Sequence, residues 1–215
     1  RTWTTPVKTN FPDARSKFCG LRLSDGRYAL VSNSNPKARD PLTLAISDDG
    51  LVYTFRLRDA KWSNGDPVTA HDFVYSYHRA LHPKTASPYA SMLFFLKNGE
   101  DFNTGKIGNF AEVGVKAVGD HELVCTLESP APYFPDVVKH TTWLPVHRGT
   151  IEKFGSMTDS YTDWQKPGNH VSNGAFHLTE WRINAHVKVR RNPHYWDAAN
   201  VKPNGIDFYP IESPY

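Results

Sequence analysis

Ten histidines are the side chains of this sequence best suited to chemistry, because imidazole binds metal ions and exchanges protons near neutral pH. The metal motif His-Glu-x-x-His does not occur, and His71 and His78 lie seven residues apart on one predicted helix without a nearby carboxylate triad. Cys19 and Cys125 are too few and too far apart for a zinc site of about four ligands. We therefore expect solvated or core-edge histidines, no metal and no other cofactor.

The signatures of common enzymes are missing as well. Neither the serine-hydrolase pentapeptide Gly-x-Ser-x-Gly nor a glycine-rich phosphate loop occurs. A carboxylate pair for sugar hydrolysis needs a cleft, and we interpret Asp120, Glu122 and Glu128 as solvated instead. Lys188 and Arg190 alternate with valines, which is typical of an exposed strand face. We expect no enzymatic activity.

Length, charge and hydropathy restrict the remaining classes of function. The 215 residues, 39% of them hydrophobic, suffice for one domain or one lobe of a larger protein. Twenty-five basic residues offset 22 acidic ones, and a net charge of +3 spread along the chain gives no footprint for nucleic acid or a membrane surface. The most apolar run, residues 92–96, is far shorter than the roughly 18 to 20 residues of a membrane span.

Alternating apolar residues predict several strands. Residues 51–58 follow the Asp-Asp-Gly turn at 48–50 and place Tyr53 and Phe55 on one face. Residues 113–118 and 123–127 form a predicted hairpin, in which Cys125 faces the core. A further hairpin is expected around residues 24–26, running into 28–31. Three more predicted strands lie at residues 175–181, 186–191 and 206–211.

Helical spacing and capping residues predict a few short helices. Thr69 and Asp72 form a capping box at the start of a helix that ends before His82-Pro83. Ser87-Pro88 and Asn98-Gly99 predict the start and end of a second helix. Shorter helices are expected through Val137 and over residues 147–154, and the two Ser-Asn-Gly segments at 63–65 and 172–174 are predicted turns. The fold class is therefore α+β, a mixed β-sheet lobe with short helices.

Several collinear motifs resemble one known family. Residues 53–58 and the run AKWSNGDPVTAHDFVYSYHRAL over 60–81 resemble the extracellular solute-binding proteins of oligopeptide ABC transporters. The segments KTASPYAS, GVKAVGDHELVCTLESPAPYF, NHVSNGAFHLTEW and VRRNPHYWD follow in the family's order and at its approximate spacing. The resemblance covers residues 48–211. It implies the periplasmic binding protein-like II fold, in which two lobes close on a ligand, with an additional β-rich subdomain.

The resemblance also suggests how the chain is divided. Residues 1–47 match the family poorly and are expected to be irregular, whereas residues 48–215 would form the β-rich subdomain and part of the first lobe. Family members are more than twice as long, and the second lobe would follow Tyr215. No leader precedes Arg1, so a secretory signal has been cleaved, was left out, or never existed.

Three residues are candidates for ligand contact by resemblance. Tyr89, in SPYAS, matches a tyrosine that contacts bound peptide in the family, and Asn173 and Gly174 match a loop near its cleft. A glycine there would let the backbone approach a ligand or the hinge closely. For Tyr89 the alternative is an aromatic ring buried at the start of a helix.

Two functions follow as hypotheses. The first is oligopeptide binding for uptake through an ABC permease, in the periplasm or outside the cell, with weak binding by this chain alone because sites of this kind need two walls. The second is a stand-alone structural or interaction domain whose free sheet edges pair in a homo-oligomer. Nucleic acid is not an expected partner. Whether Cys19 and Cys125 pair is left open by the sequence; an oxidising periplasm would permit it.

Overall fold

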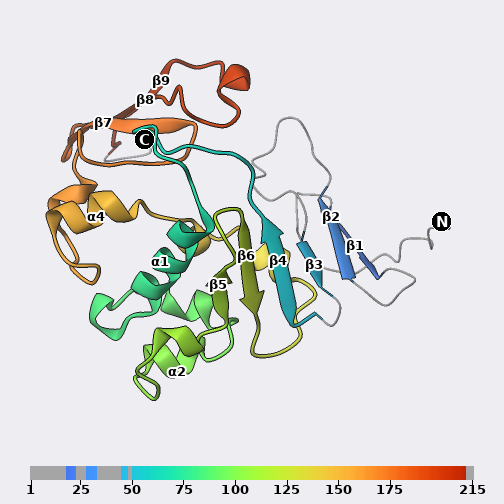
Figure 1. The fold of residues 1–215 in the computed structure, drawn as a ribbon. Coiled ribbons are helices and arrows are strands. Elements are labelled where there is room, and N and C mark those ends of the chain that lie inside the picture. The colour runs from blue at the N-terminus through green and yellow to red at the C-terminus, as the bar shows by residue number, and fades with distance from the viewer. Residues whose placement is uncertain (1–17, 23–27, 33–44, 48–49, 212–215) are drawn as a thin grey trace. The chain divides into compact units, whose positions relative to one another are not determined.

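Two antiparallel sheets organise the part of the chain that the structure describes (Figure 1). The computed structural model describes residues 18–22, 28–32, 45–47 and 50–211. The chain divides into two units, one of residues 1–58 and 69–144 and the other of residues 59–68 and 145–215. No described helix is long and apolar enough to cross a membrane. Each unit is considered below by itself.

The first unit is built on a six-stranded sheet in the order β1-β2-β3-β4-β6-β5. Its strands are β1 (Phe18–Arg22), β2 (Tyr28–Ser32), β3 (Ala45–Ser47), β4 (Val52–Arg56), β5 (Val115–Ala117) and β6 (Glu122–Thr126). The predicted alternation in β4 is confirmed, because Tyr53 and Phe55 are each 2% exposed while Val52 is 39% exposed. The Tyr53 hydroxyl donates to the carbonyl of Ala131 at 2.8 Å, which satisfies its polar end inside the core.

Helix α1 (Ala70–Leu81) lies against strands β5 and β6 of this unit (Figure 1). It begins as predicted, since the backbone N–H of Thr69 donates to Asp72 Oδ2 at 2.8 Å. The helix buries Tyr77 and Leu81, and the Tyr77 hydroxyl donates to the carbonyl of Trp143 at 3.1 Å. Burial raises the pKa of Tyr77 well above its usual value.

The predicted helix over residues 87–98 is wrong. The structure has 3₁₀ turns at Pro83–Thr85 and Ala90–Leu93, and α2 (Gly99–Asn103) begins where the predicted helix should end. Backbone bonds to a distant segment explain the difference, because Lys97 N–H donates to Thr126 O at 2.9 Å and Glu128 N–H donates to Phe95 O at 2.9 Å. These bonds, together with the isolated bridge between Leu96 and Leu127, occupy backbone groups that a continuous helix would need for its own hydrogen bonds.

Short helical segments and a buried aromatic cluster complete the first unit. The helical segments are η3 (Phe110–Glu112), α3 (Phe134–Val137) and η4 (Thr141–Trp143). The rings of Phe134 and Trp143 meet edge to face with centroids 5.1 Å apart. Cys125 is 1% exposed in this core and carries a free thiol, so it forms no disulfide, and burial raises the pKa of the thiol.

The second unit contains a three-stranded antiparallel sheet and a short helix. Its elements are α4 (Arg148–Phe154), η5 (Asp163–Gln165), β7 (Phe176–Arg182), β8 (His186–Arg191), η6 (Ala198–Asn200) and β9 (Gly205–Phe208), and the strand order is β7-β8-β9. Helix α4 and strands β7 and β8 lie where the sequence predicts them, whereas β9 ends at Phe208 and not at the predicted residue 211. Asn184, at φ 60°, makes the tight connection between β7 and β8.

The division of the chain at residue 47 is predicted from the resemblance to the family, and it stays a prediction. Within residues 1–47 the described stretches are strands, and β1 and β2 pair antiparallel from Phe18 opposite Ser32 to Arg22 opposite Tyr28. The predicted hairpin is thus present in its strands, while its turn at 24–26 lies outside the described residues. In space the chain divides elsewhere, at residues 58, 68 and 144.

Candidate functional site

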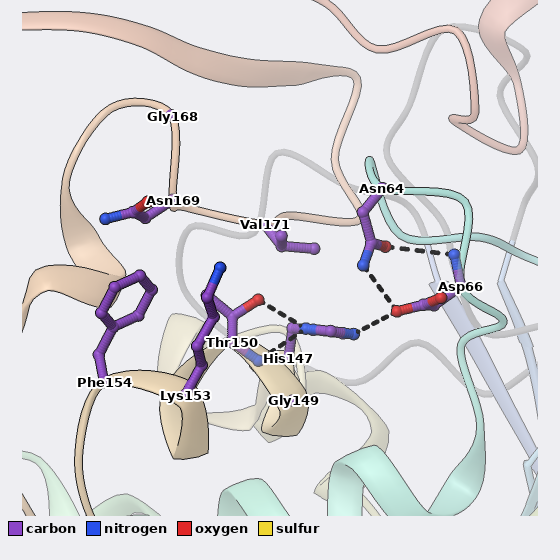
Figure 2. Close-up of a pocket in the computed structure, with 10 residues that line it drawn as sticks. All are labelled: Asn64, Asp66, His147, Gly149, Thr150, Lys153, Phe154, Gly168, Asn169 and Val171. Carbon is purple, nitrogen blue, oxygen red and sulfur yellow. Dashed lines mark hydrogen bonds and ion pairs between the residues drawn. The ribbon is translucent and has the colours of Figure 1, made fainter.

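A polar hollow of about 410 Å³ lies in the second unit (Figure 2). It is lined by Asn64, Asp66, His147, Gly149, Thr150, Lys153, Phe154, Gly168, Asn169 and Val171. These residues come from three segments: the first Ser-Asn-Gly turn, helix α4, and the loop before β7. The volume is in the range of small-molecule sites, roughly 300 to 1,000 Å³.

The turn at Asn64 holds the carboxylate of Asp66 in place. Gly65 adopts φ +95°, which only glycine tolerates readily, so the predicted turn is confirmed here. The Asn64 side-chain amide donates to Asp66 Oδ2 at 2.6 Å, and the Asp66 N–H donates back to Asn64 Oδ1 at 3.2 Å. Trp62, at the start of this segment, is 1% exposed, and its carbonyl accepts the Gly65 N–H at 2.9 Å.

His147 connects this turn to helix α4. Its Nδ1 accepts the backbone N–H of Thr150 at 3.1 Å, so the imidazole caps the first turn of the helix. A neutral ring that accepts at Nδ1 carries its proton on Nε2, which lies 3.0 Å from Asp66 Oδ2 and donates to it. The His147 side chain is 12% exposed. Its ring packs edge to face with the Trp62 ring, with the two centroids 5.3 Å apart.

Asp66, His147 and Thr150 follow one another like the carboxylate, base and hydroxyl of a hydrolase. The Thr150 hydroxyl lies 2.7 Å from His147 Nδ1. Thr150, however, is only 7% exposed, and the same Nδ1 lone pair also receives a backbone N–H. Because the single Nδ1 lone pair already accepts the Thr150 backbone N–H, it is not free to act as a base toward the hydroxyl, and this chain of contacts caps a helix and supports no acyl-transfer step.

Lys153 supplies the positive charge of the hollow. It stands one helical turn after Thr150, and its ammonium lies 5.3 Å from the centroid of the neighbouring Phe154 ring. Among the described residues, no carboxylate forms an ion pair with it. The hollow therefore has a cation on its helical wall and the Asp66 carboxylate on the wall formed by the turn (Figure 2).

Tyr89 lies in the first unit, at the start of the 3₁₀ turn Ala90–Leu93. It is 60% exposed, so the alternative of a ring buried at a helix start does not hold. Its centroid lies 5.6 Å from that of the His140 ring. His140 Nδ1 accepts the Thr142 N–H at 3.3 Å, which leaves the Nε2 proton of the neutral ring available.

Asn173 and Gly174 lie in the second unit, in the bend before β7, outside the residues that line the hollow. Gly174 has no positive φ, and a Cβ there would meet its neighbours at an ordinary 3.9 Å, so nothing described requires glycine. Its carbonyl accepts from the fully buried Asn192 amide at 2.9 Å. The two Ser-Asn-Gly segments lie together, since Ser63 N–H donates to the Ser172 carbonyl at 2.8 Å.

The two histidines of the first helix contact an aspartate and an aromatic ring. His71 Nε2 lies 3.6 Å from an Asp120 carboxylate oxygen at the surface. His78 stacks on the Phe110 ring with centroids 4.2 Å apart, and burial together with the nearby His82 lowers its pKa. Within the described ranges, no three His, Cys, Asp or Glu side chains gather as metal ligands would.

Comparison with known proteins adds the family. A model described as "Bacterial extracellular solute-binding proteins, family 5 Middle" matches residues 38–215. The periplasmic oligopeptide-binding protein OppA of Salmonella typhimurium is 45% identical over 203 residues, which are 93% of this chain and 35% of that protein. The oligopeptide-binding protein OppA of Bacillus subtilis is 37% identical over 88% of this chain and 34% of its own length.

Solved structures of oligopeptide-binding proteins are similar to this chain as well. Haemophilus influenzae OppA, in complex with RPPGFSPFR, superposes with a TM-score of 0.72 at 37% identity, over 90% of this chain and 36% of that one. The chain therefore spans about a third of the length of the relatives that it matches. The α+β class expected from the sequence, with small sheets and short helices, agrees with these neighbours.

Proposed function

Because the chain belongs to the bacterial extracellular solute-binding proteins of family 5, we propose that it contributes to oligopeptide binding for uptake through an ABC permease. The relatives that support this are named for oligopeptide binding, and one was solved with a peptide. We place the protein in the periplasm or outside the cell, because the family is described as extracellular and the Salmonella typhimurium relative is named periplasmic, and we assign it no enzymatic activity. The single observation that carries the proposal is the collinear family match over residues 38–215.

Tyr89 is the proposed peptide contact of the first unit. An aromatic ring that is 60% exposed offers a large apolar surface and a hydroxyl to a ligand at low entropic cost. Asn173 and Gly174 are proposed contacts of the second unit. Peptide recognition that tolerates many sequences uses main-chain hydrogen bonds, which the backbone of this loop would supply.

The length of the chain limits how tightly it can bind. A peptide site buries roughly 70 to 90% of its ligand, which takes walls on both sides. This chain spans about a third of its relatives, so we propose that it forms one wall and that it binds peptide alone only in the millimolar range.

Titration calorimetry of the natural gene product with a pool of tri- to pentapeptides tests the proposal. We expect tight binding, and a loss of about tenfold or more in the variant Tyr89→Ala, since removing an anchoring aromatic costs about 1.4 kcal/mol or more. Tyr133→Ala is the matched control, because Tyr133 is a comparably exposed ring of the same unit, at 48%. A gene product that binds no peptide would disprove the function, and micromolar binding by the 215 residues alone would disprove the one-wall model.

A second function, a stand-alone interaction domain, is favoured by one observation. Large apolar side chains of the three-stranded sheet are exposed, among them Trp181 at 54% and Phe208 at 52%. Exposed apolar patches of this kind mark interaction surfaces. The mass of the natural gene product separates the two functions, because transport requires a second lobe and an interaction domain does not.

A further inference from the structure

We propose that the hollow of the second unit is a separate, low-affinity site for a small zwitterion, a free amino acid or a short peptide with both termini charged. In this site Asp66 binds the ammonium group and Lys153 binds the carboxylate. The site belongs to the second unit alone, and it does not depend on the oligopeptide cleft proposed above.

Asp66 is prepared to receive a cation. Both hydrogen bonds to its side chain, from the Asn64 amide and from His147 Nε2, end on Oδ2. Oδ1 accepts no hydrogen bond within the described residues, and the side chain is 57% exposed. The carboxylate is thus fixed in orientation by two donors while one oxygen faces solvent, an arrangement that lowers the entropic cost of binding an ammonium group.

Lys153 is prepared to receive an anion. Two other lysines of this unit are paired with carboxylates, Lys166 with Asp163 and Lys188 with Glu180, each at 2.8 Å. The ammonium of Lys153 lies beside the Phe154 ring and forms no ion pair within the described residues. A ligand carboxylate would therefore meet a cation that no described side chain neutralises.

The two charges on opposite walls select the class of ligand. A simple anion would be attracted by Lys153 and repelled by Asp66, and a simple cation would meet the reverse. A zwitterion satisfies both, and Val171 and Phe154 leave an apolar part of the lining for its backbone or a small side chain. The 410 Å³ of the hollow accommodates an amino acid or a dipeptide with water around it.

The experiment titrates the 215-residue chain with glycylglycine and follows backbone amide signals by NMR. The signals of Gly149 and Gly168, which line the hollow, should shift together with a millimolar dissociation constant. N-acetyl-glycylglycine lacks the ammonium and glycylglycinamide lacks the carboxylate. Each should bind about three- to fivefold more weakly, since exposed ion pairs contribute at most about 1 kcal/mol.

Two variants assign each charge to its partner. In Lys153→Gln the advantage of glycylglycine over its amide should vanish while the advantage over the acetylated form persists, and Asp66→Asn should do the opposite. Asn at position 66 keeps an oxygen for the donors Asn64 and His147, so the hollow keeps its shape. Lys202→Gln, at an exposed lysine outside the hollow, should change neither ratio.

The outcomes separate this site from the oligopeptide cleft. Absence of shifts at Gly149 and Gly168, or equal binding of all three dipeptides, would overturn the zwitterion site and leave the proposed uptake function standing. Shifts at these glycines in a protein whose natural form binds no tri- to pentapeptide would support the site while disproving the uptake function.

Discussion

A histidine performs the capping role at α4 that serine, threonine, aspartate or asparagine usually performs. His147 Nδ1 accepts the Thr150 N–H, and its other nitrogen donates to Asp66, 81 positions earlier in the chain. One imidazole therefore satisfies an unpaired helix N–H and fixes a distant turn. Only 12% of the His147 side chain is exposed, which shields its contact with the Thr150 N–H from competing water, whereas the Asp66 side chain is 57% exposed.

Replacing His147 with alanine should destabilise the second unit. The loss of a helix cap costs about 0.5 to 2 kcal/mol, and the Asp66 carboxylate would lose a donor, so we expect a decrease of about 1 to 2 kcal/mol in the free energy of unfolding. Denaturant unfolding measures it. His71→Ala is the matched control, because His71 also faces an aspartate but is 64% exposed, and it should change stability by less than about 0.5 kcal/mol. Equal effects of both variants would show that the cap contributes nothing.

At this scale the sequence predicts some contacts and not others. The bond between Thr69 and Asp72 follows from residue types three positions apart, and it is present. The pair of His147 with Asp66 could not be found in this way, because histidine ranks low among capping residues and nothing local indicates its partner. The sequence also does not determine whether Tyr89 is exposed, because aromatic residues at turns occur both buried and exposed.

Helices and strands, too, are predictable from the sequence only where local signals agree with the final structure. Strand β4 and helix α1 were predictable because period-two and helical spacing, with a capping box, agree with the final structure. The helix over 87–98 was not, because Ser-Pro and Asn-Gly are local signals and the deciding bonds come from residues 126–128. Long-range backbone pairing overrides local preference, and a single sequence does not show it.

Gly114 sits where these long-range bonds meet, and its replacement should be costly. Its N–H donates to Lys97 O at 2.8 Å, and its carbonyl accepts the Thr126 N–H at 2.7 Å. A Cβ at this position would overlap the Thr126 carbonyl oxygen and press on the Lys97 backbone. We expect Gly114→Ala to lower the free energy of unfolding by about 1 to 3 kcal/mol. Gly108→Ala, where a Cβ meets open space, should change it little; similar losses in both would refute the steric argument.

The β7–β8 hairpin should lose stability in acid through Glu180. Hydrogen bonds from Lys188, at 2.8 Å, and from His186 lower the pKa of Glu180 to about 2. A lowered pKa means that the fold favours the charged carboxylate, so its stabilising effect is complete above the ordinary glutamate value of about 4.3 and is lost as the pH falls toward 2.

The thermal midpoint measured from about pH 5 to about pH 2 tests this expectation. It should fall less steeply in Glu180→Gln than in the unmodified chain. Glu152→Gln removes the exposed pair with Arg148 and serves as the control. Parallel curves for the unmodified chain and Glu180→Gln would show that the ionised carboxylate does not stabilise the hairpin.

At the scale of the whole molecule, the chain leaves one unit for another and returns. Residues 59–68, between β4 and α1, belong with residues 145–215. The Ser63 N–H donates to the Ser172 carbonyl, and the Ser172 N–H donates to the Ser63 hydroxyl, which joins segments 109 positions apart. The sequence indicates both Ser-Asn-Gly turns but not that they meet. The same excursion brings Asp66 to α4, so the hollow exists only because of this topology.

The three-stranded sheet presents an apolar face whose exposure has a consequence for the whole molecule. Trp181 lies opposite Val187, which lies opposite Phe208, so the three share one face across β7, β8 and β9. Ile206, next on that face of β9, is 38% exposed. Each outer strand, β7 and β9, pairs on one side only within this sheet. Apolar faces and open edges of this kind promote association.

We therefore expect the 215-residue chain to associate with itself, and sedimentation over a hundredfold range of concentration, from roughly micromolar upward, should show a rising mass. Phe208→Lys places a charge in the centre of the face and should keep the chain monomeric, whereas Val118→Lys, at a 50% exposed residue of the first unit, should not. Arg190 and Asp207, paired at 2.6 Å on the opposite face, and Pro210 beyond β9 oppose edge pairing, so the apolar face is the expected contact. A monomer at every concentration would show that the exposed apolar face is not sufficient for association.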